Sequence, residues 1–154
     1  MSLIISTGSN QGDRLQNLET AKSILCEYLD LEHESNVYES AAVDFTQQPD
    51  FLNQVLQFKI PKEEPLNVLF KVLEIEKQMG RIRIIDKGPR IIDIDLLFWD
   101  LEKITLDALV LPHPRLFKRS FIVLPLKELP FYDKLSSSFI FPYEFANSAV
   151  IYRS

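Results

Sequence analysis

Residues 80–99 read GRIRIIDKGPRIIDIDLLFW, a basic segment followed directly by an apolar one. The first part, residues 81–90, holds one acidic residue, Asp86, and four basic ones: Arg81, Arg83, Lys87 and Arg90. The second part, residues 91–99, is rich in β-branched and aromatic residues, which predicts a strand. Because successive strand residues face opposite ways, Asp93 and Asp95 should share one side, and the other should be wholly apolar, with Ile92, Ile94, Leu96 and Phe98.

The strand rise would place the Cβ atoms of Asp93 and Asp95 about 6.5–7 Å apart. A solvated sheet face would tolerate such a pair, because water screens the repulsion between the two charges. The alternative is a site for a hard cation such as Mg²⁺, which prefers carboxylate oxygens and keeps waters and substrate phosphates as its other ligands. The neighbouring arginines favour this alternative, since guanidinium groups bind phosphate oxygens bidentately.

Length and composition predict one globular domain over residues 1–154. The chain is 46% hydrophobic and 25% charged, which argues against disorder. Its net charge of −5 is uneven: residues 1–80 carry 6 basic and 13 acidic residues, and residues 81–154 carry 11 and 9. An acidic protein with a local basic loop suits a small phosphorylated ligand better than a nucleic acid.

Cysteine usage and the apolar runs bear on the compartment. Cys26 is the only cysteine, so the chain has no intrachain disulfide, which fits a reducing compartment. The N-terminus lacks the basic region of a signal peptide, and no apolar run approaches the ~20 residues of a membrane span. We therefore expect a cytoplasmic protein without a membrane partner, acting as a monomer.

Hydrophobic periodicity and helix-end signals predict the order strand, helix, strand, strand, helix, strand. Asp13 should cap the first helix, with Gln16 three residues on, and Pro65 should begin the second, with Gly80 just after its end. The predicted elements are residues 3–7, 14–29, 32–40, 51–60, 65–79 and 91–99. This order is that of an α+β, ferredoxin-like βαββαβ core, in which both helices cover one face of an antiparallel sheet.

The predicted fold places a candidate active site on the sheet face that the helices leave open. The apolar sides of the third and fourth strands should face the helices, so Phe51, Asn53, Asp93 and Asp95 should share the open face. The helix over residues 65–79 carries two apolar stripes and is expected to be broadly buried.

A second basic cluster lies at residues 111–121, where Arg115, Lys118 and Arg119 follow His113. His113 stands between two prolines, which hold it in an extended or turn conformation. A lone histidine is usually structural or simply exposed, and only its basic neighbours favour a functional reading. Residues 121–126 should form another short buried element, and the pattern assigns nothing after residue 131.

Four motifs, in this order and spacing, make residues 3–129 resemble the 6-hydroxymethyl-7,8-dihydropterin pyrophosphokinase family of folate biosynthesis. The motifs are Gly8-Ser9-Asn10; QPDFLN at residues 48–53; Gly80-Arg81-x-Arg83 continuing to Gly88-Pro89-Arg90-x-x-Asp93-x-Asp95; and Leu111-Pro112-His113 with Arg119 and Phe121.

The resemblance implies transfer of a pyrophosphoryl group from ATP to 6-hydroxymethyl-7,8-dihydropterin, with release of AMP. Asp93 and Asp95 would hold two Mg²⁺ ions and, with Arg81 and Arg90, form the catalytic group. The ATP-binding residues implied are Glu76 near the adenosine part and, at the phosphates, Arg81, Arg83, Arg90, His113 and Arg119. Phe51 and Phe121 would sandwich the pterin, whose edge would bind Asn53 and the backbone around Ser40, Ala41 and Val43.

Two rival readings share the predicted order of strands and helices. An RNA-recognition domain needs stacking aromatics on its first strand, and residues 3–7 contain none. A ferredoxin-like regulatory or acyl-phosphate-hydrolysing domain would explain an arginine but not the paired aspartates. The sequence has no Gly-x-x-x-x-Gly-Lys-Ser/Thr phosphate loop, so we expect the arginines of residues 81–90 to replace it and the loop to close over ATP.

Overall fold

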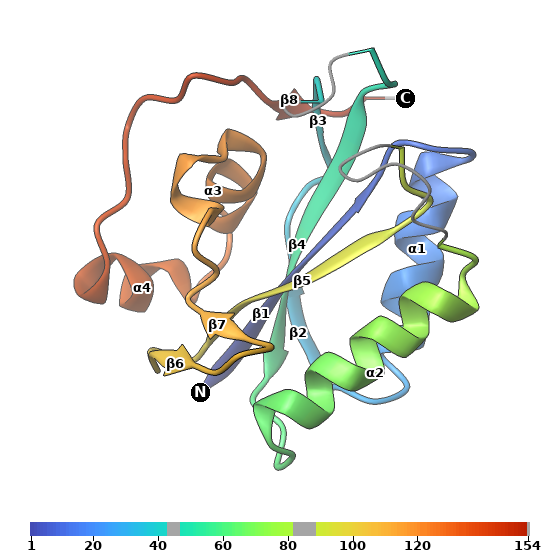
Figure 1. Ribbon diagram of the computed structural model, residues 1–154. Coiled ribbons are helices and arrows are strands. Elements are labelled where there is room, and N and C mark those ends of the chain that lie inside the picture. The colour runs from blue at the N-terminus through green and yellow to red at the C-terminus, as the bar shows by residue number, and fades with distance from the viewer. Residues whose placement is uncertain (43–46, 82–88, 154) are drawn as a thin grey trace.

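The computed structural model describes residues 1–42, 47–81 and 89–153, and a six-stranded antiparallel sheet forms its centre (Figure 1). The strand order is β5–β1–β4–β3–β8, and β2 also pairs with β4. The core elements are β1 (Ser2–Ser9), α1 (Arg14–Leu25), β2 (Leu31–Glu34), β3 (Tyr38–Ser40), β4 (Phe51–Lys59), α2 (Pro65–Gln78) and β5 (Asp93–Trp99). The predicted α+β, ferredoxin-like architecture is confirmed.

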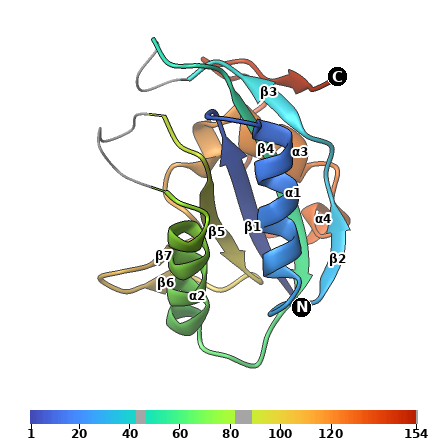
Figure 2. The ribbon, with the colours of Figure 1, turned by 90° about the vertical axis from the view of Figure 1, so that its right-hand side faces the viewer.

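The elements that follow β5 form a third layer, a small hairpin and one further strand of the central sheet. They are β6 (Ile104–Thr105), β7 (Val110–Leu111), a 3-10 helix (Leu116–Lys118), α3 (Ser120–Leu126), α4 (Tyr132–Ser138) and β8 (Val150–Ile151). Helices α1 and α2 cover one face of the sheet, whereas α3 and α4 lie on the other (Figures 1 and 2). The single strand predicted over residues 32–40 was wrong, because these residues form two short strands, β2 and β3.

The predicted helix ends are largely confirmed. The Asp13 side chain accepts a hydrogen bond from the Gln16 N–H at 3.1 Å and caps α1. Helix α1 ends at Leu25, earlier than predicted, and residues 26–29 continue as hydrogen-bonded turns. Pro65 begins α2, and Gly80 follows its end with a φ of 86°, which glycine adopts without strain. None of the described helices is both long and apolar enough to cross a membrane.

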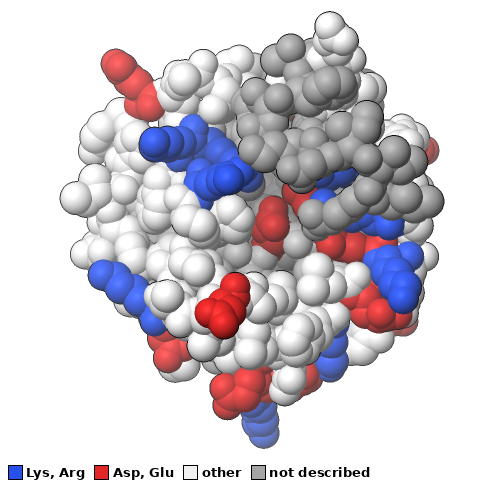
Figure 3. Space-filling model, viewed as in Figure 1, with Lys and Arg blue, Asp and Glu red and all other residues white. Residues whose placement is uncertain are grey.

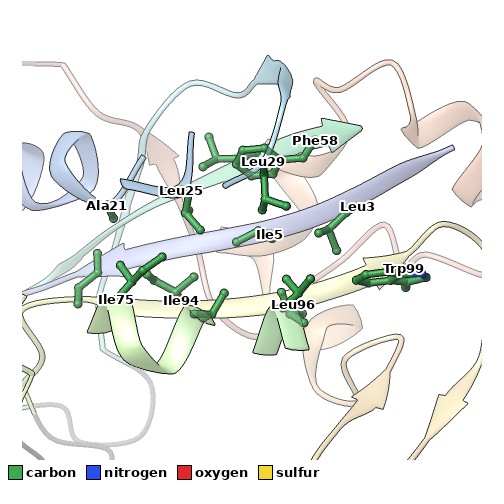
Figure 4. Close-up of a cluster of buried hydrophobic side chains, with 14 of the residues drawn as sticks. Leu3, Ile5, Ala21, Leu25, Leu29, Phe58, Ile75, Ile94, Leu96 and Trp99 are labelled. Atoms are coloured by element: carbon green, nitrogen blue, oxygen red, sulfur yellow. The ribbon is translucent and has the colours of Figure 1, made fainter. Parts of the chain in front are cut away.

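The main hydrophobic core lies between the sheet and the helix pair α1 and α2. Figure 4 shows Ile5, Ile94 and Leu96 of the sheet facing residues such as Leu25 and Ile75 of the helices. Helix α2 is less buried than its sequence predicts. Its Val68, Val72 and Ile75 are buried, but Phe70 is 57% exposed and Leu73 45% exposed.

A second hydrophobic core covers part of the opposite sheet face. It joins residues of the sheet to residues of the third layer, namely Ile4, Val55, Leu97, Phe98, Leu116, Ile122, Val123, Leu126, Leu129, Phe131, Leu135 and Phe141. Phe98 lies at the centre of a group of rings, with centroids 5.5 Å from Phe139 and 6.3 Å from Phe117. The buried element predicted at residues 121–126 is therefore α3.

The predicted face of Phe98 was wrong because β5 contains a β-bulge. Ile5 of β1 is opposite Leu96, but its neighbour Ile4 is opposite Phe98, so Leu97 is an extra residue. The bulge reverses the alternation after Leu96. Phe98 consequently packs in the second core, and Trp99 takes the place on the helix side.

Candidate active site

The strand register places acidic and amide side chains in one row across the sheet face opposite α1 and α2. Gly8 of β1 lies opposite Asn53 of β4 on one side and Asp93 of β5 on the other. Directly opposed residues of antiparallel strands share a face. Ile94 belongs to the core under the helices, so Asp93 and Asp95 point to the other face, as the sequence predicts.

Asp93 is the centre of a network of ion pairs. Its Oδ1 lies 3.0 Å from Arg81 Nη1, and its Oδ2 lies 3.4 Å from Arg90 Nη1. Arg81 also pairs with the buried carboxylate of Glu76, whose Oε2 accepts the Ile94 N–H at 2.8 Å. Glu76 therefore holds both Arg81 and the edge strand β5.

Several predicted site residues line one cavity of about 300 Å³ next to β5. Glu76, Arg81, Asp93, Asp95 and His113 all contribute to its wall. Residues of α2 and of the segment 107–110 form its apolar sides. Figure 3 views the molecule from the β5 edge and shows basic and acidic side chains close together near a central hollow.

Two carboxyl groups of this cavity, those of Asp95 and Glu76, have raised pKa values. Burial raises the pKa of Asp95 from 3.8 to about 7, and the negative charges of Asp93 and Glu76 add to the effect. Burial also raises the pKa of Glu76. Within the described ranges, no hydrogen bond reaches the Asp95 carboxylate. The cavity can therefore accept further positive charge beside Asp95.

His113 lines the same cavity as a neutral side chain. Its backbone N–H donates to the Leu97 carbonyl at 3.0 Å, and its Nδ1 accepts the Arg115 N–H at 3.3 Å. Burial lowers the pKa of His113, and the positive charge of Arg119 lowers it further. Because Nδ1 is an acceptor, the proton of the neutral ring is on Nε2, which is then free to donate to a ligand.

Arg119 and Phe121 come from the junction between the 3-10 helix and α3. The guanidinium carbon of Arg119 lies 5.7 Å from the centroid of the Phe121 ring. On the other side of the site, Phe51 is the first residue of β4 and pairs with Ser40 of β3. The predicted site residues therefore reach the open face from β3, β4, β5 and α3.

Asn53 offers an unused acceptor at the β4 end of the row. Its Nδ2 lies 3.5 Å from the Thr7 carbonyl, but its buried Oδ1 has no partner among the described residues. A Cβ on Gly8 would lie 2.5 Å from Asn53 Nδ2, so only glycine leaves this amide in place. Nearby, Ser40 is buried and Ala41 exposed. A ligand that donates a hydrogen bond would satisfy Asn53 Oδ1.

Asn10 joins two segments that carry predicted site residues, a role that the sequence did not reveal. Its Nδ2 donates to Gln48 Oε1 at 2.8 Å and to the Pro49 carbonyl at 3.1 Å. Its Oδ1 accepts the Arg90 N–H at 2.7 Å, and its own N–H donates to the Arg90 carbonyl at 3.0 Å. The Gly8-Ser9-Asn10 motif was the available signal, but only the fold brings its three partners together.

Two predicted site residues lie outside the described residues. Arg83 belongs to residues 82–88, and Val43 belongs to residues 43–46. The expected closure of the basic loop concerns the same part of the chain. These three predictions stay predictions.

A family profile described as 7,8-dihydro-6-hydroxymethylpterin-pyrophosphokinase (HPPK) matches residues 4–130. The chain is 42% identical over 131 residues to an Aquifex aeolicus protein named 2-amino-4-hydroxy-6-hydroxymethyldihydropteridine pyrophosphokinase, covering 83% of this chain and 79% of that protein. A Bacillus subtilis protein of the same name is 35% identical over 127 residues, covering 81% of this chain and 75% of its own length.

A longer relative also matches over the same part of the chain. The Folic acid synthesis protein fol1 of Pneumocystis carinii is 36% identical over 129 residues, which is 83% of this chain but only 17% of that protein. The region matched by the family profile contains every predicted site residue and the β1–β5 core except the first two residues of β1. The chain belongs to the 7,8-dihydro-6-hydroxymethylpterin-pyrophosphokinase family.

Proposed function

We propose that this chain transfers the pyrophosphoryl group of ATP to the hydroxymethyl oxygen of 6-hydroxymethyl-7,8-dihydropterin, with two Mg²⁺ ions bound beside Asp93 and Asp95. Membership of the family supports the pterin substrate and pyrophosphoryl transfer in folate synthesis. The proposal adds ATP as the donor, the metal ions and the role of each residue. We further expect the protein to act as a monomer in the cytoplasm.

The row Asp93–Gly8–Asn53 is the observation that carries the proposal. It separates a charged group at β5 from an amide acceptor at β4, with no side chain between them. A reaction between a phosphate ester and a flat heterocycle needs two such regions side by side, so that the reacting atoms meet over the gap. Gly8 is the position at which we expect the hydroxymethyl group to approach the β-phosphorus.

Basic residues on the β5 side of the gap would bind the triphosphate. Arg81 and Arg90 pair with Asp93 in the described structure, and Arg119 lies near His113. Guanidinium groups bind phosphate oxygens in bidentate fashion, and the Nε2–H of neutral His113 can donate one further hydrogen bond. Phosphoryl transfer asks the protein mainly for such positioning and charge neutralisation.

The donor set at β5 fits Mg²⁺ bound together with a nucleotide. Asp93 and Asp95 supply carboxylate oxygens, and the described residues contain no group of three or more His, Cys, Asp or Glu side chains arranged for a metal ion. Mg²⁺ is usually held by one or two carboxylates, with waters and substrate phosphates completing its coordination. When bound, Mg²⁺ would neutralise charge on the phosphate oxygens and the leaving oxygen.

Groups on the β4 side of the gap would hold the pterin. The buried Asn53 Oδ1 lacks a partner and can accept a hydrogen bond from an amino or ring N–H group. Phe51 and Phe121 are partly buried rings that can stack on a planar heterocycle. This arrangement would fix the hydroxymethyl group toward Gly8.

In the reaction, a bond forms between the hydroxymethyl oxygen and the β-phosphorus of ATP. The bond between the β-phosphorus and the oxygen bridging to the α-phosphorus breaks, and AMP leaves with that oxygen. The hydroxyl proton is released. Arg81 and Arg90 are placed to hold the transferred group while this exchange proceeds.

Incubation of the protein with ATP, Mg²⁺ and 6-hydroxymethyl-7,8-dihydropterin tests the proposal, with AMP and the pterin diphosphate as the expected products. Formation of ADP would identify an ordinary kinase and reject pyrophosphoryl transfer. Asp95→Ala should lose several orders of magnitude in turnover, because one of two metal-binding carboxylates is removed. Near-normal turnover of Asp95→Ala would remove Asp95 from the site.

A further inference from the structure

The C-terminal segment, residues 139–153, lies beyond the region matched by the family profile and contacts the third layer. It leaves α4, runs past α3 on the side away from the sheet and ends at β8 beside β3 (Figure 1). Phe141 and the partly buried Phe139 and Phe145 pack in the second core and fix the middle of the segment. The segment therefore spans the distance between α3 and the edge of the sheet.

Asn147 connects this segment to the start of α3. Its Oδ1 accepts the backbone N–H of Ser120 at 2.9 Å and also accepts the Ser120 hydroxyl. Its Nδ2 donates to the carbonyl oxygen of Lys118 at 3.2 Å. The first N–H groups of a helix need partners outside the helix, and Arg119, at the N-cap position, makes no side-chain cap hydrogen bond. Asn147 supplies the missing cap from 27 residues away.

The hydrogen bonds of Asn147 fix the backbone on both sides of Arg119. Lys118 precedes Arg119, Ser120 follows it, and Phe121 comes next in the chain. Ser120 is only 1% exposed, so its N–H and hydroxyl would be left without partners if the Asn147 side chain were removed. The direction of the Arg119 and Phe121 side chains therefore depends on Asn147.

The other end of the segment is attached close to the predicted pterin edge. Val150 pairs with Glu39 of β3, which precedes Ser40 in the chain. The Tyr152 N–H donates to the Val37 carbonyl at 2.8 Å. The segment thus ties the start of α3 to the strand that carries Ser40.

We propose that Asn147 is a positioning residue for the pyrophosphoryl transfer, acting by holding Arg119 toward the phosphates and Phe121 toward the pterin. The proposal rests on the proposed function. Asn147 does not touch either substrate. It sets the backbone from which two substrate-binding side chains extend.

Asn147→Ala tests this role, because it removes all three hydrogen bonds from a partly exposed position without changing the core. We expect the KM values for ATP and for the pterin to rise together by roughly tenfold, the cost of one lost helix cap, with a smaller change in kcat. Hydrogen exchange of the Ser120 amide should accelerate in the same variant. Asn147→Asp keeps the acceptor for Ser120 and should restore slow exchange and most of the substrate affinity.

Gln57→Ala is the matched control. Gln57 Oε1 accepts the backbone N–H of Phe131, the residue just before α4, at 3.1 Å, so a distant amide side chain holds the start of α4 as Asn147 holds the start of α3. Helix α4 carries no predicted site residue, so this variant should lower stability while leaving both KM values within about twofold of the wild-type values.

Two results would overturn the proposal. One is faster Ser120 exchange in Asn147→Ala with unchanged KM values, which would make Asn147 purely structural. The other is unchanged Ser120 exchange. A wild-type protein that forms no AMP would instead reject the proposed function, and exchange at Ser120 would still decide whether Asn147 holds the start of α3.

Discussion

Replacing Asp95 by asparagine should stabilise the ligand-free protein at neutral and alkaline pH while abolishing its activity. Burial and the charges of Asp93 and Glu76 raise the pKa of Asp95 from 3.8 to about 7 in the folded protein. The unfolded chain releases this proton near pH 4, so the folded state binds more protons between pH 4 and 7. Folding stability therefore falls as the pH rises through this range, and asparagine, which does not ionise, avoids the loss.

The magnitude follows from the shift. A change from 3.8 to about 7 corresponds to roughly 4 kcal/mol at 1.36 kcal/mol per pKa unit. This value is an upper limit, because the asparagine amide must find its own hydrogen-bond partners in a site where the Asp95 carboxylate had none among the described residues. We expect a gain of about 2–4 kcal/mol above pH 7.5 and almost none at pH 4.

Urea unfolding of both proteins at several pH values between 4 and 8, with a chelator present, measures this difference. The free energy of unfolding of Asp95→Asn minus that of the wild type should rise with pH and level off above pH 7. Asp107→Asn is a suitable control, because Asp107 is an exposed carboxylate that lines the same cavity. A difference that is equal at pH 4 and pH 8 would refute the reasoning.

Three further substitutions test separate parts of the site. Gly8→Ala should push the Asn53 amide aside and raise the KM for the pterin about tenfold. Calorimetry should find ATP binding nearly unchanged in this variant. An unaltered pterin KM would contradict the prediction. Asn10→Ala removes the three hydrogen bonds that the Asn10 side chain makes to Gln48, Pro49 and Arg90 and should lower the free energy of unfolding by roughly 1–3 kcal/mol, and an unchanged urea midpoint would show that water replaces them. Glu76→Gln removes one negative charge beside Asp95 and should lower the Asp95 pKa. The chemical shift of the Asp95 carboxyl carbon in NMR follows this titration. An unchanged Asp95 titration midpoint would argue against the charge effect.

Local signals explain why the order of elements could be predicted from the sequence. Asp13, Pro65 and Gly80 mark helix ends through their own backbone and side-chain chemistry, and each lies where the structure has that end. Strand alternation also placed Asp93 and Asp95 correctly, because that strand is regular up to Leu96. These signals act within a few residues.

Contacts between distant residues explain what the sequence did not reveal. Asn10 meets Gln48 and Arg90, and Ser120 meets Asn147, only because the sheet and the third layer bring them together. The C-terminal region also lacks a strong hydrophobic period, since its helix α4 has only seven residues. Its role could be read only from the partners that it contacts.

The bulge at Leu97 gives β5 two functions on one sheet face. Before the bulge, the β5 residues on this face are Asp93 and Asp95, and both line the cavity. After it, Leu97 and Phe98 both turn to this face and pack beneath α3 and α4. A regular strand would direct Phe98 to the helix side and remove the ring on which Phe117 and Phe139 pack. The bulge therefore anchors the layer that carries Arg119 and Phe121 at a fixed distance along the strand from Asp93 and Asp95. The spacing between these two pairs of predicted site residues is thus set within β5 itself.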